Sequence, residues 1–147
     1  MVNELLQQEK GNFPDARKTL DQVLSLNPLF VPATRDLAIL CFDRFPDDSR
    51  TADLAAKARD TFPDDPNLAK VLGVVAYRRA NYSAAAQYLK QSLQTRKNDG
   101  ELLYYLGMAQ YQLKAKAESK AALQQALALN IQAKLAGEAR RVLTELK

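Results

Sequence analysis

The clearest alternation of apolar and polar positions lies at the end of the chain, in residues 132–147. Apolar side chains recur there at intervals of three and four residues, and charged side chains occupy the opposite face, which predicts an amphipathic helix. The apolar set is Leu135, Ala139, Val142, Leu143 and Leu146, and the charged set, whose members can pair along the helix, is Lys134, Glu138, Arg141 and Glu145. We expect a capping helix, apolar toward the rest of the fold and charged toward water.

Upstream of this segment, the apolar positions repeat with a fixed period. Leu72-Gly73 recurs as Leu106-Gly107, and Leu89 recurs as Leu123, each at an offset of 34 residues. The same offset relates Tyr77 to Tyr111, Ala85 to Ser119, and Ser92-Leu93 to Ala126-Leu127. A period of 34 residues is typical of a repeated pair of helices. The frequent Ala, Leu, Gln and Lys also favour an all-helical chain.

One extra residue interrupts the period in the first half of the chain. Leu37 precedes Leu72 by 35 residues, whereas Ala58 precedes Ser92 by 34. We place the extra residue in the stretch 44–49, where a proline and two aspartates predict a turn. An insertion there lengthens a loop and leaves the helices in phase.

The repeated positions resemble the tetratricopeptide repeat (TPR): Leu-Gly and an aromatic residue in a first helix, a small residue opening a second helix, a large apolar residue four positions later, and a closing Asn-Pro. The best single match is 11–28, GNFPDARKTLDQVLSLNP. First helices are expected near 31–44, 67–79 and 101–113, and second helices near 49–61, 83–95 and 116–129. The resemblance covers essentially the whole chain and implies a right-handed α-solenoid of about four TPR helical hairpins plus the C-terminal capping helix.

The same resemblance implies a single TPR domain over residues 1–147. Its repeats are expected near 1–30, 31–65, 66–99 and 100–131, with the capping helix at 132–147. Because Gly11 lies only ten residues after Met1, the first helix of the first repeat lacks its opening turn. We therefore expect the sequence to be the C-terminal part of a larger TPR protein.

Some positions depart from the family pattern. In the second repeat, Ala38 replaces the glycine and Ala55 replaces the large apolar residue, while Lys97 and Ile131 stand where a closing proline is expected. These departures weaken individual units but keep the repeat in phase, and the phase is what stacks neighbouring repeats.

Composition and motifs argue against catalysis. The chain has no histidine, which removes the commonest general base and metal ligand. It also has no Gly-rich phosphate loop, Gly-x-Ser-x-Gly elbow or paired-cysteine motif. The aspartate pairs 47–48 and 64–65 precede helices, and Asp65-Pro66 matches a capping aspartate followed by proline. Cys41 fits a buried, inert thiol. We expect no enzyme activity, no cofactor and no metal site.

Charge and hydropathy bear on partners and location. Residues 1–73 carry 9 basic and 12 acidic side chains, whereas residues 74–147 carry 12 basic and 5 acidic side chains. This charge gradient can steer an acidic partner to the second half of the chain. Alternatively, it is only a solvated surface with no partner. A lone cysteine fits a reducing compartment such as the cytoplasm without excluding the periplasm. No apolar run is long enough to span a membrane. A fragment can lack its targeting segment, so the location is left open.

The resemblance implies that the concave wall of the solenoid, lined by first helices, binds a partner. The residues expected there are Arg35, Ile39 and Phe42 in one repeat, Lys70, Val74, Tyr77 and Arg78 in the next, and Tyr104, Met108, Tyr111 and Gln112 in the last. Amphipathic tyrosines and a pliable methionine suit a binding groove, and Arg35 with Lys70 could meet a carboxylate of the guest. Tyr77 and Tyr111 could instead fill gaps between repeats.

This wall predicts an apolar peptide or an amphipathic helix as ligand. Some TPR relatives clamp a C-terminal carboxylate with lysines and groove asparagines, but Ile39, Val74 and Met108 occupy the expected asparagine positions. We therefore expect a protein–protein interaction module or assembly scaffold. The alternative is a structural spacer or self-association segment of a larger protein. RNA binding is less favoured, because the period is 34 and the basic residues lie mostly on second helices and loops.

Overall fold

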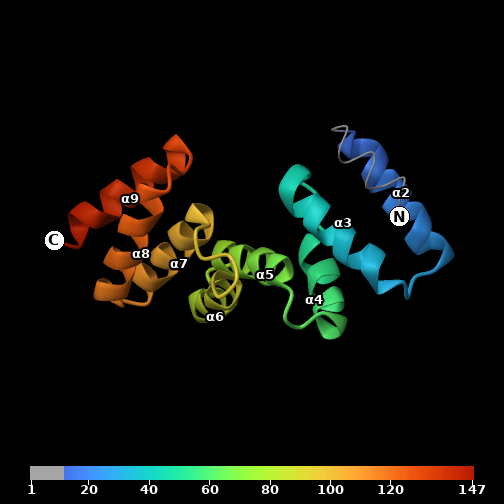
Figure 1. Ribbon diagram of the computed structural model, residues 1–147, viewed down its shortest axis with the longest axis horizontal. Helices are drawn as coiled ribbons and strands as arrows, with labels where there is room; N and C mark the ends of the chain where they lie inside the picture. Colours follow the sequence, from blue (N-terminus) through green and yellow to red (C-terminus); the bar gives the residue numbers. More distant parts are fainter. Residues whose placement is uncertain (1–11) are drawn as a thin grey trace. The chain divides into compact units, whose positions relative to one another are not determined.

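The computed structural model describes residues 12–147, and those residues form eight α-helices and no strand. In chain order, as coloured from blue to red in Figure 1, they are α2 (Phe13–Leu26), α3 (Val31–Arg44), α4 (Thr51–Thr61), α5 (Pro66–Arg78), α6 (Tyr82–Leu93), α7 (Gly100–Gln112), α8 (Lys116–Ala128) and α9 (Ala133–Glu145). The seven helices predicted between residues 31 and 147 are therefore confirmed, and each begins and ends within two residues of its expected bounds. The expected first helix of the first repeat lies outside the described residues.

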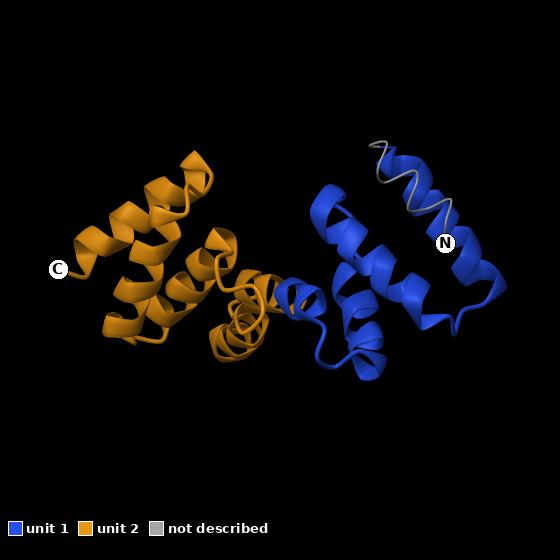
Figure 2. Cartoon of the chain, viewed as in Figure 1, with its two compact units in different colours: residues 1–71 blue, residues 72–147 orange. Residues whose placement is uncertain are grey.

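The chain divides into two compact units, residues 1–71 and residues 72–147, which Figure 2 shows in blue and orange. Unit 1 contains α2, α3 and α4, and unit 2 contains α6 to α9. The division falls within α5. The single-domain organisation and the repeat boundaries stay predictions.

Capping side chains set the starts of several helices. Asp65 precedes α5, and its Oδ1 accepts hydrogen bonds from the backbone N–H of Asn67 at 2.8 Å and of Leu68 at 3.2 Å. Asp99 occupies the equivalent place before α7 and accepts from the N–H of Leu102 at 3.1 Å. These contacts satisfy N–H groups that have no partner within the helix. The capping role predicted for Asp65 is confirmed.

In unit 1, α2 packs against α3 and α3 packs against α4. The core is formed by Ala16 and Leu20 of α2 and by Ala33, Leu37, Leu40 and Cys41 of α3. Two arginine–phenylalanine stacks also join α2 to the C-terminal end of α3: Arg17 lies 3.9 Å from the ring centre of Phe45, and Arg44 lies 4.2 Å from that of Phe13. Such stacks add cation–π attraction to the apolar packing.

In unit 2, the repeated glycines lie where two helices come closest. Gly73 of α5 faces Leu89 of α6, and Gly107 of α7 faces Leu123 of α8; both leucines are fully buried. The Ser119 hydroxyl at the start of α8 donates a 2.7 Å hydrogen bond to the Gly107 carbonyl. The small and large residues of the repeat therefore meet in pairs, which lets the helices approach closely.

The last helix, α9, packs against both α7 and α8. Ala136, Ala139 and Val142 on it are buried, and the rest of its apolar face packs on the same core as Leu103 and Met108 of α7. The apolar face predicted for the capping helix is confirmed. Because α9 covers α7, it also decides how much of the first-helix wall stays open in unit 2.

Candidate functional site

Four tyrosines of unit 2 form a chain of edge-to-face ring contacts. Tyr77 of α5 lies 5.7 Å from Tyr82 of α6 and 5.4 Å from Tyr105 of α7, and Tyr105 lies 5.0 Å from Tyr104, all measured between ring centres. Edge-to-face pairs at these distances stabilise one another beyond the area they bury. We call these four residues the tyrosine cluster.

The phenol groups of Tyr77 and Tyr104 in this cluster stay protonated well above neutral pH. Burial raises the pKa of Tyr104 to about 12, and the neighbouring Tyr77 and Tyr105 phenols act in the same direction. Burial also raises the pKa of Tyr77, with smaller effects in the same direction from Tyr82, Tyr105 and Glu138, and Arg141 acts in the opposite direction. The hydroxyl groups of Tyr77 and Tyr104 therefore remain hydrogen-bond donors.

A row of charged residues on α9 lies beside these rings. Arg141 reaches Glu138 at 3.0 Å and Glu145 at 2.9 Å, which confirms the pairing predicted for these three residues. The Tyr111 hydroxyl donates a hydrogen bond to Glu145 Oε2. Roughly half of each charged side chain is exposed: 53% for Arg141, 48% for Glu138 and 45% for Glu145. We call the tyrosine cluster, Tyr111 and this row together the aromatic–acidic face.

The residues expected on the wall of unit 2 differ in how accessible they are. Val74, Tyr104 and Met108 are buried, and Tyr104 and Met108 belong to the core on which α9 packs. Tyr77 and Tyr111 are half-buried, whereas Arg78 and Gln112 are exposed. A guest on this wall would therefore contact mainly Tyr77, Arg78, Tyr111 and Gln112.

Sequence reasoning missed part of this face. Tyr82 and Tyr105 were not expected there, although both extend the tyrosine cluster. The charged side of α9 was expected simply to face water, but Glu145 also holds Tyr111. The available signal was the repeat itself, because a helix after the last hairpin takes the place of a further first helix and packs on the preceding one.

In unit 1, the expected wall residues Arg35, Ile39, Phe42 and Lys70 are all half-buried. Arg35 is engaged within the chain: its Nη1 donates to Asp36 at 2.9 Å and its Nε donates to Asp65, the cap of α5. Burial opposes ionisation of Asp65, but the Arg35 hydrogen bond and the backbone N–H donors lower the pKa of this carboxyl group. The Arg35 guanidinium thus already has two carboxylate partners.

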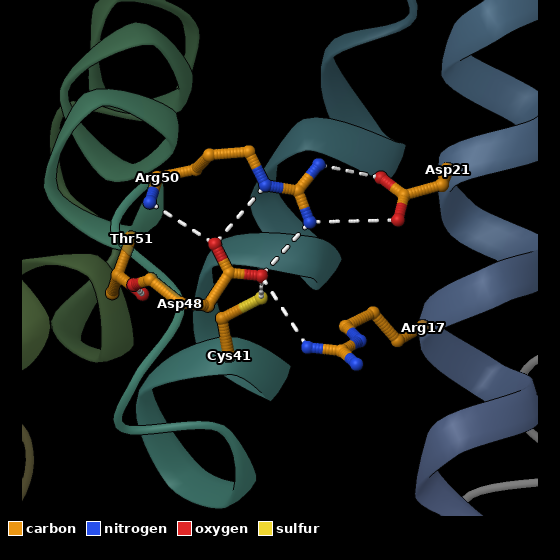
Figure 3. Close-up of polar contacts among 6 residues, drawn as sticks. All are labelled: Arg17, Asp21, Cys41, Asp48, Arg50 and Thr51. Carbon is orange, nitrogen blue, oxygen red and sulfur yellow. Dashed lines mark hydrogen bonds and ion pairs between the residues drawn. The ribbon is translucent and has the colours of Figure 1, made fainter.

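A separate polar cluster forms at the extra-residue loop between α3 and α4 (Figure 3). Asp48 accepts hydrogen bonds from the Arg50 backbone N–H at 3.0 Å and from the Arg50 guanidinium at 3.0 and 2.9 Å. Arg50 also reaches Asp21 of α2 at 2.7 Å, and Arg17 of α2 lies 3.6 Å from Asp48. The inserted loop is therefore tied to α2.

This cluster does not activate the nearby thiol. Cys41 is fully buried and donates to Asp48 Oδ2 at 3.3 Å. Burial and the Asp48 carboxylate raise the pKa of Cys41 to about 12, so the thiol stays protonated at neutral pH. Within residues 12–147, no group of three or more potential metal-ligating side chains comes together. The absence of catalysis, cofactor and metal stays a prediction.

A cavity of about 340 Å³ adjoins the same loop. It is lined by Arg17, Arg44, Phe45, Pro46, Asp47 and Asp48. Two cationic and two anionic side chains balance each other there, and both arginines are stacked on phenylalanine rings. The composition of this cavity does not favour a ligand of either charge.

Comparison with known families agrees with this architecture. The profile of the tetratricopeptide repeat family matches residues 5–66 and 70–134. These two segments make up most of the chain, so the protein belongs to the tetratricopeptide repeat family. The all-α solenoid class predicted from the repeat is thereby confirmed, and this fold supports a role in protein–protein interaction or scaffolding.

Solved structures show the same fold at low sequence identity. MamA of AMB-1 matches with a TM-score of 0.77 at 21% identity, covering 99% of this chain and 83% of that one. MamA of MSR-1 matches with a TM-score of 0.74 at 21% identity, covering 99% and 81%. PilF of Pseudomonas aeruginosa matches with a TM-score of 0.70 at 22% identity, covering 98% and 66%. No curated protein sequence matches significantly.

None of the helices in residues 12–147 is long and apolar enough to cross a bilayer.

Proposed function

We propose that this protein is a binding module that holds a peptide or helix of a partner protein on the aromatic–acidic face of unit 2. The observation that carries the proposal is the half-exposed tyrosine and carboxylate surface formed by α5, α7 and α9. A terminal repeat that only closes a solenoid presents a polar outer face to water, whereas this face also presents aromatic rings.

The chemistry of this face suits a protein guest. Tyrosine rings supply apolar contact area with little loss of side-chain entropy, and their hydroxyl groups satisfy polar atoms of the guest. From the predicted wall, Tyr77, Arg78, Tyr111 and Gln112 are the residues a guest would contact, and Tyr105 joins them. An amphipathic helix laid along the face would use the helix-in-groove mode of recognition.

Unit 1 has proposed contact residues of its own. Ile39, Phe42 and Lys70 are half-buried, and we keep them as proposed contact residues. Arg35 has a weaker case, because a guest carboxylate would compete with Asp36 and Asp65 for its guanidinium. The prediction that Arg35 binds the guest is therefore less supported than the predictions for its neighbours.

Site-specific photo-crosslinking in the source cells tests the proposal. A benzophenone amino acid is placed at Gln112 on α7 or, as the matched control, at Gln124 on α8; both are exposed glutamines in helices. We expect a discrete crosslinked protein from position 112, lost when Tyr77 and Tyr105 are both changed to alanine in a chain that keeps its helicity. Equal crosslinking from both positions would contradict the proposal.

The alternative function is a structural spacer or self-association segment. The half-buried tyrosines favour it to the extent that a second copy could cover them as well as a partner could. Sedimentation of the isolated chain separates the two functions. A monomer over a wide range of concentrations supports the binding module, whereas a concentration-dependent dimer abolished by Tyr77→Ala with Tyr105→Ala supports self-association.

A further inference from the structure

Helix α9 can leave unit 2 without separating any other pair of helices. Among the described helices of this unit it packs only on α7 and α8, and the side chains that it buries are small: Ala136, Ala139 and Val142. The hairpin of α7 and α8, by contrast, is closed by the fully buried Leu123 lying on Gly107. An element that buries so little opens more readily than the hairpin on which it docks.

The turn that joins α8 to α9, residues 129–132, has no residue that breaks a helix. Its sequence is Leu-Asn-Ile-Gln, whereas Pro28 and Pro63 interrupt the corresponding turns before α3 and α5. Asn130 keeps the turn closed by taking a left-handed conformation, with φ of 56°. Straightening the turn would return Asn130 to the ordinary helical region, which L residues prefer. Residues 116–145 can therefore form one continuous helix.

The start of α9 is also weakly held. Gln132 at its N-cap makes no side-chain hydrogen bond to the first turn, whereas Asp65 and Asp99 cap α5 and α7. In a continuous helix, the N–H groups of that first turn would gain carbonyl partners from the preceding turn. One contact opposes this change, because Ile131 packs on Gly100, where an added Cβ would lie 2.6 Å from Ile131 Cγ2. We therefore expect the turn to open slowly.

The surface under α9 is complementary to α9 itself. Tyr104 of α7 forms one core with Ala139 and Val142 of α9. Near the C-terminal end of α9, Glu145 accepts a hydrogen bond from the Tyr111 hydroxyl. A second copy of the chain carries the same helix. It therefore offers this surface an occupant whose apolar and polar contacts the structure shows to fit.

From these observations we propose that two copies of this chain exchange α9. The turn becomes helical, α8 and α9 join into one helix from Lys116 to Glu145, and α9 of each copy docks on α7 and α8 of the other copy. The contacts of Ala139, Val142 and Glu145 re-form between the copies, so their free energy is nearly unchanged. The balance between monomer and dimer then depends on the conformation of the turn and on the concentration of the chain.

This inference goes beyond the proposed function and does not depend on it. In the exchanged dimer, the aromatic–acidic face is built by two copies, because Glu145 of one copy bonds Tyr111 of the other. The dimer considered above as the alternative function is different, since there the tyrosines of two intact copies cover one another. Because exchange requires α9 to undock first, freshly prepared chain stays monomeric and the sedimentation comparison is made before any warming.

The distance between α8 and α9 within one chain reports the exchange directly. Spin labels are attached at Ala117→Cys on α8 and Thr144→Cys on α9, two exposed positions. Cys41 takes no label, because it is fully buried and its thiol stays protonated. The two labels would lie about 40 Å apart in a continuous helix. They lie close together in the closed chain, where the end of α9 is beside the end of α7.

The labelled chain is mixed with an excess of unlabelled chain, so that each dimer contains at most one labelled copy. The mixture is warmed at a chain concentration of about 0.5 mM and separated by size-exclusion chromatography. Double electron–electron resonance then measures the distance between the labels in the monomer and dimer fractions.

A proline at the first position of α9 separates the closed turn from the continuous helix. The start of a helix tolerates proline, and Gln132 already has the ψ of 144° that suits the residue before a proline. Ala133→Pro should therefore keep the closed fold. The same proline would lie inside the continuous helix, so the dimerisation constant should fall about a hundredfold or more. Ala133→Gln is the matched control and should change this constant by no more than a few-fold.

Asn130→Ala acts in the opposite direction. Alanine is less tolerated than asparagine in the left-handed region and more favoured within a helix. We expect this variant to raise the dimerisation constant about tenfold. Thermal melting of the monomer fraction of each variant checks that the closed fold is retained.

The exchange predicts a label distance of about 40 Å in the dimer and a short distance in the monomer. A dimer with only the short distance, or the absence of any dimer in both the wild-type chain and the Asn130→Ala variant, would overturn it. A dimer that survives Ala133→Pro but is abolished by Tyr77→Ala with Tyr105→Ala would also overturn it, in favour of self-association between intact copies. The crosslink from position 112 tests the guest independently of all these results.

Discussion

A Cβ atom added to Gly107 would lie 2.7 Å from both Cγ and Cδ2 of Leu123. The preceding repeat has the same relationship, because a Cβ on Gly73 would lie 2.8 and 2.7 Å from the corresponding atoms of Leu89. Each pair closes a helical hairpin by letting a buried leucine lie directly on the backbone of the first helix. The glycine is therefore required for close approach, and the chain conformation there is ordinary helix.

Gly107→Ala should lower the free energy of unfolding by about 1–3 kcal/mol, because the added methyl group forces the fully buried Leu123 to shift. The matched control is Gly137→Ala on the exposed side of α9, where an added Cβ meets nothing within 4 Å. That change should instead raise stability by about 0.5–1 kcal/mol through helix propensity. Urea unfolding followed by circular dichroism measures both. The same sign for the two variants would contradict this account.

Two residues of the second repeat depart from the family pattern, and both lie in the same helical hairpin. Ala38 occupies the position of Gly107, Ala55 occupies the position of Leu123, and both alanines are fully buried. We predict that the two are coupled: Ala55→Leu alone should cost about 1–3 kcal/mol through overpacking. Adding Ala38→Gly should recover a coupling free energy of about 1 kcal/mol in a double-mutant cycle. Simple additivity of the two changes would show that they do not share a contact.

Two hairpin turns place a side chain in the left-handed region of backbone conformation. Ala80 has φ of 62° and Lys114, which is 34 residues later, has φ of 63°. Non-glycine residues are disfavoured there by roughly 1–2 kcal/mol. Ala80→Gly and Lys114→Gly should therefore each stabilise the chain by up to about 1 kcal/mol. Asn130→Gly, at φ of 56°, is the control and should gain less, because asparagine tolerates this conformation.

Asp48 should make stability sensitive to acid. Its hydrogen bonds with Arg50 outweigh burial and lower the pKa of Asp48 below its ordinary value of 3.8. A depressed folded-state pKa means that the contribution is complete above about pH 4 and is lost as the pH falls below that value. Asp48→Asn should cost about 1–3 kcal/mol at neutral pH and reduce the loss of stability on acidification. Asp47→Asn, a change at the exposed neighbouring residue, should neither lower the stability at neutral pH nor reduce its loss on acidification. Urea melts at pH 7 and pH 3 measure both variants.

The helices could be predicted from the sequence because their signals are local or strictly periodic. The 34-residue offset fixed which residues begin each hairpin, and Asp65-Pro66 marked the start of α5 through contacts only two and three residues away. The extra residue was placed in the stretch 44–49, and residues 45–49 of that stretch lie in the loop between α3 and α4. Each of these features depends on neighbours close in sequence or on the repeat itself.

The details of the wall depend instead on which elements dock together. Arg35 pairs with Asp65 across 30 residues, and Tyr111 bonds Glu145 across 34. Whether Tyr104 and Met108 face a guest or a core depends on how far α9 covers α7. Periodicity gives the direction of a side chain on its own helix, but it does not show what the next helix covers.

The most direct test of the proposed binding face is a hydrogen–deuterium exchange footprint. The whole chain is measured alone and then bound to the partner recovered from the source cells. We predict that binding slows exchange in α7 and α9, around Tyr105, Tyr111 and Glu145, and leaves α8 around Lys120 unchanged. Protection confined to α6 and α8, with none in α7 or α9, would contradict the assignment of the aromatic–acidic face as the binding site.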